Sequence, residues 1–189
     1  IGGSLPQGVS PEIYRKIITI VKRCQSTVVL DVDGEALRAG ITARPDVIKP
    51  NIHELSELVG RELHGMEEIA AAAREINRQG VKIVLVSMGA RGILMVSEGK
   101  EFLAVPPKVD VASTIGAGDS SVAGFISGLV QKKDLELCLA YAAAAGTATT
   151  LHQGTALAQK DDFDRLAPQV QVTALAEVIE QEKRKANAP

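Results

Sequence analysis

The stretch Ser113-Thr114-Ile115-Gly116-Ala117-Gly118-Asp119-Ser120-Ser121 places two glycines directly ahead of a carboxylate and a helix-forming run. Gly116 and Gly118 allow a tight turn and a close approach of the backbone to a ligand. The helix that the sequence predicts from Ala117 would direct unsatisfied N–H groups and the positive end of its dipole toward that turn. Asp119, in the first helical turn, could accept a proton from a hydroxyl held there. The stretch therefore predicts an anion site with a base, and a glycine-rich loop with Asp119 as a helix cap is the alternative.

On either side of this stretch, segments of helical and strand periodicity alternate along the chain. Helices are predicted at residues 11–24, 34–39, 51–59, 66–79, 117–130, 135–149 and 159–166, with a helical tail from residue 173. Strands are predicted at residues 27–31, 46–48, 82–87, 92–96 and 101–105. This alternation predicts an α/β fold with a doubly wound, mostly parallel sheet.

The first predicted helix has a clear start and an apolar stripe. Ser10 is the expected N-cap and Pro11 the first helical residue. The residues expected to form its buried face are Ile13, Ile17, Ile20 and Val21.

Several polar residues follow predicted strands, where ligands of doubly wound sheets bind. Lys49, Asn51, Ser87 and Gly116 each come directly after or close behind such a strand, so we expect them to converge. Asn51 and Glu54 are three residues apart on the opening turn of a helix, which makes both side chains face the same way.

The composition is that of an ordinary globular domain. Of the 189 residues, 46% are hydrophobic and 23% charged, so the chain can bury a core as one domain. A net charge of −2 and few aromatic residues argue against binding to nucleic acid or to an anionic membrane. Cys24 and Cys138 lack metal-binding spacing and are expected to be reduced thiols. With no long apolar span, we expect a cytoplasmic protein.

Four motifs follow one another along the chain: Gly2-Gly3-Ser4-Leu5-Pro6, Lys49-Pro50-Asn51-Ile52-His53-Glu54, Ser87-Met88-Gly89-Ala90-Arg91-Gly92 and the glycine-rich stretch ending at Ser121. Taken in this order, they resemble the motifs of the ribokinase-type sugar kinases known as the pfkB family, and within it the phosphofructokinase branch. The resemblance runs from Gly3 to about Asp162 and implies a ribokinase-like three-layer α/β/α fold. It also implies that residues 1–170 are the C-terminal portion of the nucleotide-binding and catalytic domain, followed by a charged helical tail at 171–189. The N-terminal part of the family fold and its lid would be absent, with Ile1 as the end of a strand that begins upstream.

The same resemblance implies transfer of the γ-phosphoryl group of ATP to a sugar hydroxyl. Asp119 would be the general base and contact the substrate, and Gly116, Ala117 and Gly118 would present N–H groups to the transferring oxygens. Ser4 would be a sugar contact. The residues matched to nucleotide contacts are Lys49, Asn51, Ser87, Met88, Gly89, Ala90, Arg91, Gly92, Ala143 and Thr147.

Two metal sites are also implied. Asn51 and Glu54 would organise Mg²⁺, through water, because Mg²⁺ gives up its hydration shell reluctantly. The residues matched to a K⁺ site built from carbonyl groups are Ser113, Ile115, Thr149, His152 and Gly154.

Each of these matches has a structural alternative. Lys49 could be a solvated cation at a strand end, and Asn51 with Glu54 could be a helix cap and its first-turn acid. The 87–92 segment could be a plain hairpin turn, and His152 is interpreted as a loop residue. The small residues of 140–149 could simply let one helix lie close to another.

Fructose 6-phosphate is the substrate that the resemblance favours, through the run Thr150-Leu151-His152-Gln153-Gly154-Thr155. Ala156 and Ser121 depart from the pattern of the minor bacterial 6-phosphofructokinase, so 1-phosphofructokinase and tagatose-6-phosphate kinase specificities stay open. A non-catalytic nucleotide-binding or assembly fragment is the other alternative. We expect the chain alone to be inactive, and to form a homo-oligomer or associate with an N-terminal half, because an uncovered sheet edge favours association.

Overall fold

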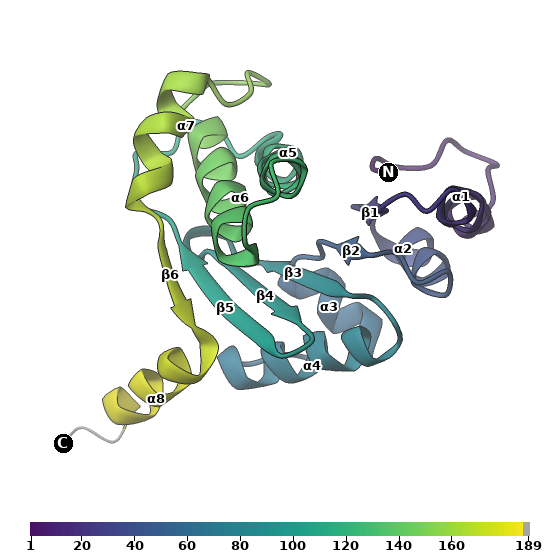
Figure 1. Cartoon of the computed structure of the whole chain (residues 1–189), viewed down its shortest axis with the longest axis horizontal. Helices are drawn as coiled ribbons and strands as arrows, with labels where there is room; N and C mark the ends of the chain where they lie inside the picture. The colour runs from purple at the N-terminus through teal and green to yellow at the C-terminus, as the bar shows by residue number, and fades with distance from the viewer. Residues whose placement is uncertain (187–189) are drawn as a thin grey trace. The chain divides into compact units, whose positions relative to one another are not determined.

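The computed structural model describes residues 1–186, and the chain forms two compact units (Figure 1). Of the described residues, the first unit comprises 1–87 and 95–100, and the second comprises 88–94 and 101–186. Among the described residues, six strands are hydrogen-bonded in sequence order, β1-β2-β3-β4-β5-β6. None of the helices within residues 1–186 combines the length and the apolar character needed to cross a membrane.

The first unit alternates helices with short parallel strands. It contains α1 (Glu12–Arg23), β1 (Val29–Leu30), α2 (Gly34–Ile41), β2 (Val47–Ile48), α3 (Ile52–Val59), α4 (Met66–Arg78) and β3 (Ile83–Ser87). Val47 of β2 pairs with Val29 of β1 and with Ile83 of β3, both in parallel. Strands with apolar residues on both faces are typical of a parallel sheet covered by helices, and Leu30, Ile48 and Val84 are fully buried.

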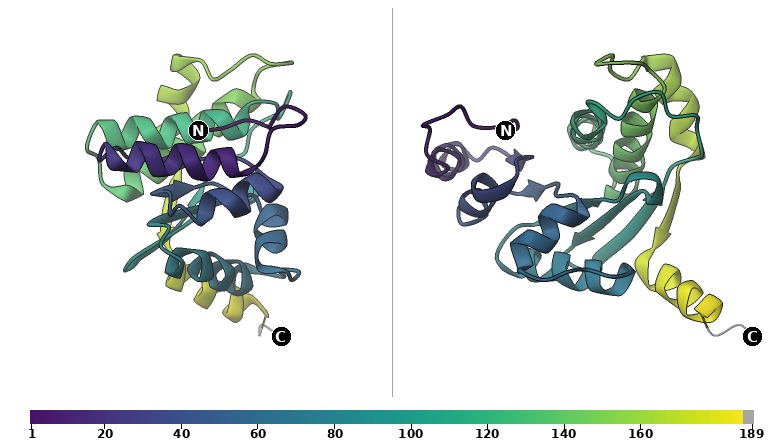
Figure 2. Two further views of the ribbon diagram at one scale, coloured as in Figure 1. Left: turned by 90° about the vertical axis from the view of Figure 1, so that its right-hand side faces the viewer. Right: turned by 180° about the vertical axis from the view of Figure 1, so that it is seen from behind.

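The second unit is built around two long helices. It contains the 3₁₀ helix η1 (Gly89–Arg91), the start of β4 (Ile93–Ser97), most of β5 (Lys100–Val105), α5 (Ala117–Val130), α6 (Leu135–Thr150), α7 (Lys160–Leu166), η2 (Ala167–Gln169), β6 (Gln171–Ala174) and α8 (Leu175–Ala186). Figures 1 and 2 show α5 lying alongside α6. They approach so closely that a Cβ added to Gly124 would lie 2.3 Å from the carbonyl oxygen of Tyr141. This confirms that small residues allow close packing between these helices.

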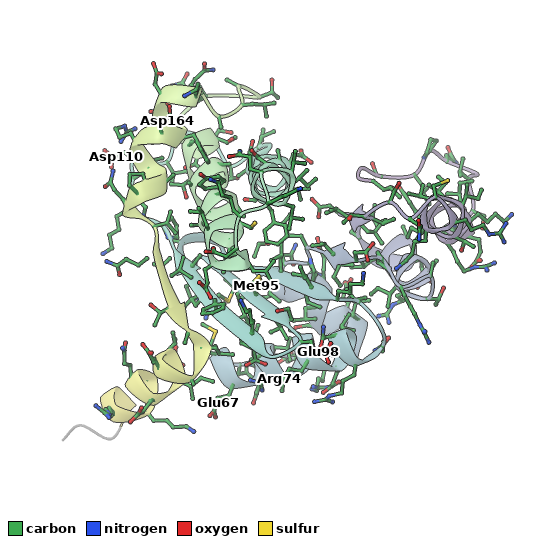
Figure 3. All side chains as sticks on the ribbon, in the orientation of Figure 1. Glu67, Arg74, Met95, Glu98, Asp110 and Asp164 are labelled. Atoms are coloured by element: carbon green, nitrogen blue, oxygen red, sulfur yellow. The ribbon has the colours of Figure 1, made fainter. Side chains whose placement is uncertain are left out.

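Figure 3 labels a buried and an exposed side chain of the first unit. Met95 on β4 is fully buried, whereas Glu67 on α4 is exposed. The buried residues of α4 recur with helical spacing, as in Met66, Ile69, Ala70, Ala73 and Ile76. The amphipathic helix predicted at 66–79 is therefore confirmed.

The predicted face of the first helix is wrong. Ile13, Ile17 and Ile20 are exposed, and the buried residues of α1 are Tyr14 and Ile18. The hydroxyl of Tyr14 donates to the carbonyl oxygen of Gly3 at 2.8 Å, which fixes the rotation of the helix about its axis. The helix also begins one residue later than predicted, with Pro11 as N-cap and the hydroxyl of Ser10 accepting from the Glu12 N–H.

The predicted helical tail is wrong at its start. Gln171–Ala174 forms β6, which pairs antiparallel with β5 and places Val105 opposite Gln171. The helix α8 begins only at Leu175. The strand forms because a partner is available in β5, which the local sequence does not reveal. Residues 187–189 of that predicted tail lie outside the described residues.

Asp46 contacts three other segments of the first unit, at the amino ends of the strands. Its carboxylate accepts from the N–H of Val28 at 2.9 Å and lies 2.7 Å from Lys82 and 3.7 Å from Lys22. Burial acts to raise the pKa of Asp46, but the hydrogen bonds from Lys82 and Val28 and the charge of Lys22 outweigh it and hold the pKa below its ordinary value.

Replacing Asp46 by Asn should therefore destabilise the protein in a pH-dependent way. The contribution of a carboxylate with a lowered pKa is complete above its ordinary value of 3.8 and is lost as the pH falls through the lower folded value. We expect Asp46→Asn to lower the free energy of unfolding by about 1–3 kcal/mol near neutral pH. The loss should shrink as the pH falls from neutral to below 3.8, through the lower pKa of the folded state. Urea denaturation at both pH values measures this, with the exposed Asp33→Asn as control, and an equal loss at both would contradict it.

Position 92 requires glycine because of its backbone conformation and because of its close contact with Ala104. It has φ +95°, and an added Cβ would lie 1.9 Å from the carbonyl oxygen of Ala104. Gly92→Ala should therefore lower the free energy of unfolding by about 3 kcal/mol or more. The matched control is Gly99→Ala, where φ is +73° and no atom lies within 4 Å. It should cost only about 1 kcal/mol. Equal melting temperatures for the two variants would show that the contact with Ala104 is unimportant.

Candidate active site

The first turn of α5 presents unpaired backbone donors beside a carboxylate. Gly116 is the N-cap, with φ +77°, a conformation that glycine adopts without steric cost. Its carbonyl oxygen accepts from the Ser120 N–H at 2.9 Å, and the Ala117 N–H donates to Thr114 at 3.3 Å. Within residues 1–186, the N–H groups of Gly118 and Asp119 have no acceptor. Unpaired N–H groups at the positive end of a helix dipole can bind an anion, and here they lie next to the exposed side chain of Asp119.

Two loops pack around this turn and bring together the residues matched to the K⁺ site. The Ser113 hydroxyl donates to the Gly154 carbonyl oxygen at 3.0 Å and accepts from the Ile115 N–H at 3.2 Å. The Thr149 carbonyl oxygen accepts from the His152 N–H at 3.2 Å. The segments 113–115 and 149–154 are therefore neighbours, as a site shared between them requires.

His152 has a specific partner on α7. Its Nε2 lies 2.9 Å from Asp162, which also accepts from Arg165 at 2.7 Å. The Arg165 hydrogen bond, with a smaller contribution from His152, keeps the pKa of Asp162 below its ordinary value. Figure 3 shows Asp164 on the same helix, where it pairs with Lys160. The interpretation of His152 as a loop residue is thus incomplete, because its side chain attaches the loop to α7.

In the first unit, Asn51 and Glu54 form a reciprocal cap on α3. The Asn51 side-chain oxygen accepts from the Glu54 N–H at 2.9 Å, and the two Glu54 carboxylate oxygens accept from the Asn51 N–H at 2.9 Å and from Nδ2 at 2.7 Å. The structural alternative of a helix cap is therefore confirmed. Each carboxylate oxygen keeps a further lone pair, so the oxygen donor set fits a metal ion held through water. No group of three or more metal-ligating side chains occurs in the part of the chain that the structure describes.

Lys49 is buried rather than solvated. Only 7% of its side chain is exposed, and its Nζ lies 3.2 Å from Oδ1 of Asp31, directly after β1. The alternative of a solvated cation is therefore wrong. Asp31 is a residue of this site that the sequence reasoning missed, although a carboxylate directly after a buried strand was a visible indication. The N–H of Ser87 donates to the Pro50 carbonyl oxygen at 3.0 Å, so Asn51, which follows β2, and Ser87, which ends β3, lie together as predicted. Their convergence with Gly116 stays a prediction.

The remaining matched residues have varied surroundings. Met88 and Gly92 are buried, whereas Gly89, Ala90 and Arg91 form the exposed turn η1. The Met88 N–H donates to the Gly92 carbonyl oxygen at 2.9 Å and closes that turn. On α6, Ala143 is buried and Thr147 half-buried. Ser4 is exposed.

A family model supplies the deciding comparison. The model described as pfkB family carbohydrate kinase matches residues 1–162. The chain belongs to the pfkB family of carbohydrate kinases. A 1-phosphofructokinase from Vibrio cholerae is 37% identical over 175 residues, which cover 93% of this chain and 55% of that protein. The chain thus spans about half the length of the curated relatives it matches.

Solved structures of pfkB-type kinases share the fold. The phosphofructokinase-2 from Escherichia coli, solved in complex with potassium, is 38% identical with a TM-score of 0.86, over 89% of this chain and 55% of that one. A ribokinase from Arabidopsis thaliana, solved with ribose and ATP, is 30% identical with a TM-score of 0.73, over 85% of this chain and 54% of that one. The predicted ribokinase-like α/β fold is therefore confirmed.

Proposed function

We propose that this chain supplies the anion hole and the general base of an ATP-dependent kinase that phosphorylates a sugar phosphate. The observation that carries the proposal is the first turn of α5, where two unpaired N–H groups and the positive end of the helix dipole lie beside Asp119. Membership of a carbohydrate kinase family supports the reaction class, and the likeness to a ribokinase solved with ATP supports the phosphoryl donor.

The reaction transfers the γ-phosphoryl group in line from ATP to a sugar hydroxyl. Asp119 takes the hydroxyl proton as the new bond from oxygen to phosphorus forms, and the bond to the bridging oxygen of ADP breaks. The N–H groups of Gly118 and Asp119 stabilise charge on the transferring oxygens. When bound, Mg²⁺ would neutralise charge on the phosphates. Asn51 and Glu54 would hold this ion through water molecules.

The nucleotide and K⁺ assignments extend this proposal. Lys49, Asn51, Ala143, Thr147 and the 87–92 segment contact the nucleotide. The ion pair with Asp31 fixes the direction of Lys49, so that its charge is already oriented when the phosphates bind. The carbonyl groups of Ser113, Ile115, Thr149, His152 and Gly154 hold K⁺, which the likeness to a phosphofructokinase solved with potassium supports.

Two fructose phosphates are the candidate substrates. Fructose 6-phosphate is favoured by the 150–155 run and by the structural likeness to phosphofructokinase-2. Fructose 1-phosphate is favoured by the relative named 1-phosphofructokinase. Both give fructose 1,6-bisphosphate, so only kinetic comparison of the two substrates separates them. If neither turns over and ATP still binds, the chain acts as a nucleotide-binding or assembly component instead.

Asp119→Asn should remove most of the turnover. The amide cannot accept the hydroxyl proton, and general-base catalysis typically contributes about 10²–10⁴-fold. ADP release is measured with both fructose phosphates, and ATP affinity by calorimetry, in whichever polypeptide shows activity, the 189-residue chain or a longer one that contains it. ATP affinity should be preserved. The control is Asp110→Asn, an exposed carboxylate ahead of the same stretch (Figure 3). An Asp119→Asn variant that keeps more than about a tenth of the wild-type kcat would remove Asp119 from the base role.

Glu54→Gln should raise the Mg²⁺ concentration that gives half of the maximal rate. The substitution keeps the shape of the side chain but removes the charge that attracts metal-bound water, and such outer contacts typically change metal affinity about 10–100-fold. Titration of Mg²⁺ at saturating ATP measures the effect. Glu57→Gln on the same helix, where the carboxylate lies 3.1 Å from His53, is the matched control. Identical Mg²⁺ curves for the two variants would leave Glu54 as a helix-capping residue only.

A further inference from the structure

Thr149, near the end of α6, has a hydroxyl with three partners although only 1% of the residue is exposed. Its Oγ1 lies 2.6 Å from Ser120 Oγ and 3.2 Å from the Ala145 carbonyl oxygen. It also accepts from the Ala158 N–H at 3.0 Å. One hydroxyl offers one hydrogen and two lone pairs, so this group is saturated within the protein.

These partners belong to three segments around the anion hole. Ser120 directly follows Asp119, and its N–H closes the first turn of α5 on the Gly116 carbonyl oxygen. Ala158 belongs to the loop after α6, which places the neighbouring Leu157 against Gly116. A Cβ added to Gly116 would lie 2.9 Å from Leu157 Cδ2 and 3.9 Å from Thr149 Cγ2. The hydroxyl and the methyl group of Thr149 therefore both border the turn.

We propose that the Thr149 hydroxyl is a positioning group that fixes the first turn of α5, and with it the Gly118 and Asp119 donors and the Asp119 carboxylate. The proposal rests on the proposed function for its catalytic consequence. Displacement of reacting groups by about 1 Å can cost about 10²-fold in rate. A hydroxyl that holds Ser120 on one side and Ala158 on the other restrains such displacement without touching the substrate.

The neighbouring residues offer a matched set of variants. Thr149→Val keeps the branched shape but leaves Ser120 Oγ and the Ala158 N–H without this partner. Thr149→Ser keeps the hydroxyl and loses only the methyl group. Thr150→Val is the control, because within residues 1–186 the Thr150 hydroxyl has one partner, the Thr147 carbonyl oxygen of its own helix, at 2.7 Å.

The kinetic test is made on the polypeptide that shows turnover. We expect Thr149→Val to lower kcat about 10–100-fold while KM for ATP and for the phosphosugar changes less than about twofold, since the donors act on the transition state. Thr149→Ser and Thr150→Val should stay within about threefold of wild type. Thr149→Val could instead melt at a lower temperature than wild type and yet, assayed below its melting transition, keep kcat within about threefold of wild type. Thr149 would then be only structural, and the proposal would be overturned.

A second measurement needs no activity. Amide hydrogen exchange in the 189-residue chain should be about tenfold faster or more at Ala158 and Ser120 in Thr149→Val, and unchanged in Thr149→Ser and Thr150→Val. Equal exchange in all variants overturns the positioning role. Lack of kinase activity in the unaltered protein would instead overturn the proposed function, and exchange would still decide whether Thr149 holds the turn.

Discussion

The left-handed backbone conformation of Gly116 is the constraint on which the candidate site depends. It ends the incoming loop and starts α5 in the direction that leaves the Gly118 and Asp119 N–H groups unpaired. The close approach of α5 to α6 then brings the Thr149 hydroxyl within reach of Ser120. Backbone geometry and helix packing together hold the turn that we propose as the anion hole.

Two aspartates of the first unit lie at opposite ends of its strands. Asp46, ahead of β2, connects Val28, Lys22 and Lys82 and contributes to stability. Asp31, after β1, holds Lys49 at the carboxyl end, where ligands bind in sheets of this kind. Both carboxylates are paired with lysines, but Asp46 lies at the amino ends of the strands and Asp31 at the carboxyl ends.

The capping box of α3 gives Asn51 and Glu54 a structural role that is compatible with the role we propose for them at Mg²⁺. Asn51 and Glu54 satisfy each other's hydrogen bonds and fix the start of the helix. That mutual restraint also fixes the Glu54 carboxylate in one orientation, which is what a water-mediated metal contact requires. A pattern that is explained by local structure can therefore still be part of a reaction site.

The sequence by itself determined the features that depend on neighbours along the chain. The bounds of α5 and the glycine-rich turn were predicted, and the Asn51 cap was the structural alternative for its motif. Capping, periodicity and glycine torsions all act within a few residues. Only the tertiary structure decided which stripe of α1 is buried, that Gln171–Ala174 is a strand, and that Lys49 meets Asp31 and Thr149 meets Ser120. These features depend on partners that are distant in the sequence, such as Asp31 for Lys49 or Phe102 for Ala174. No local pattern specifies which distant group will be in reach.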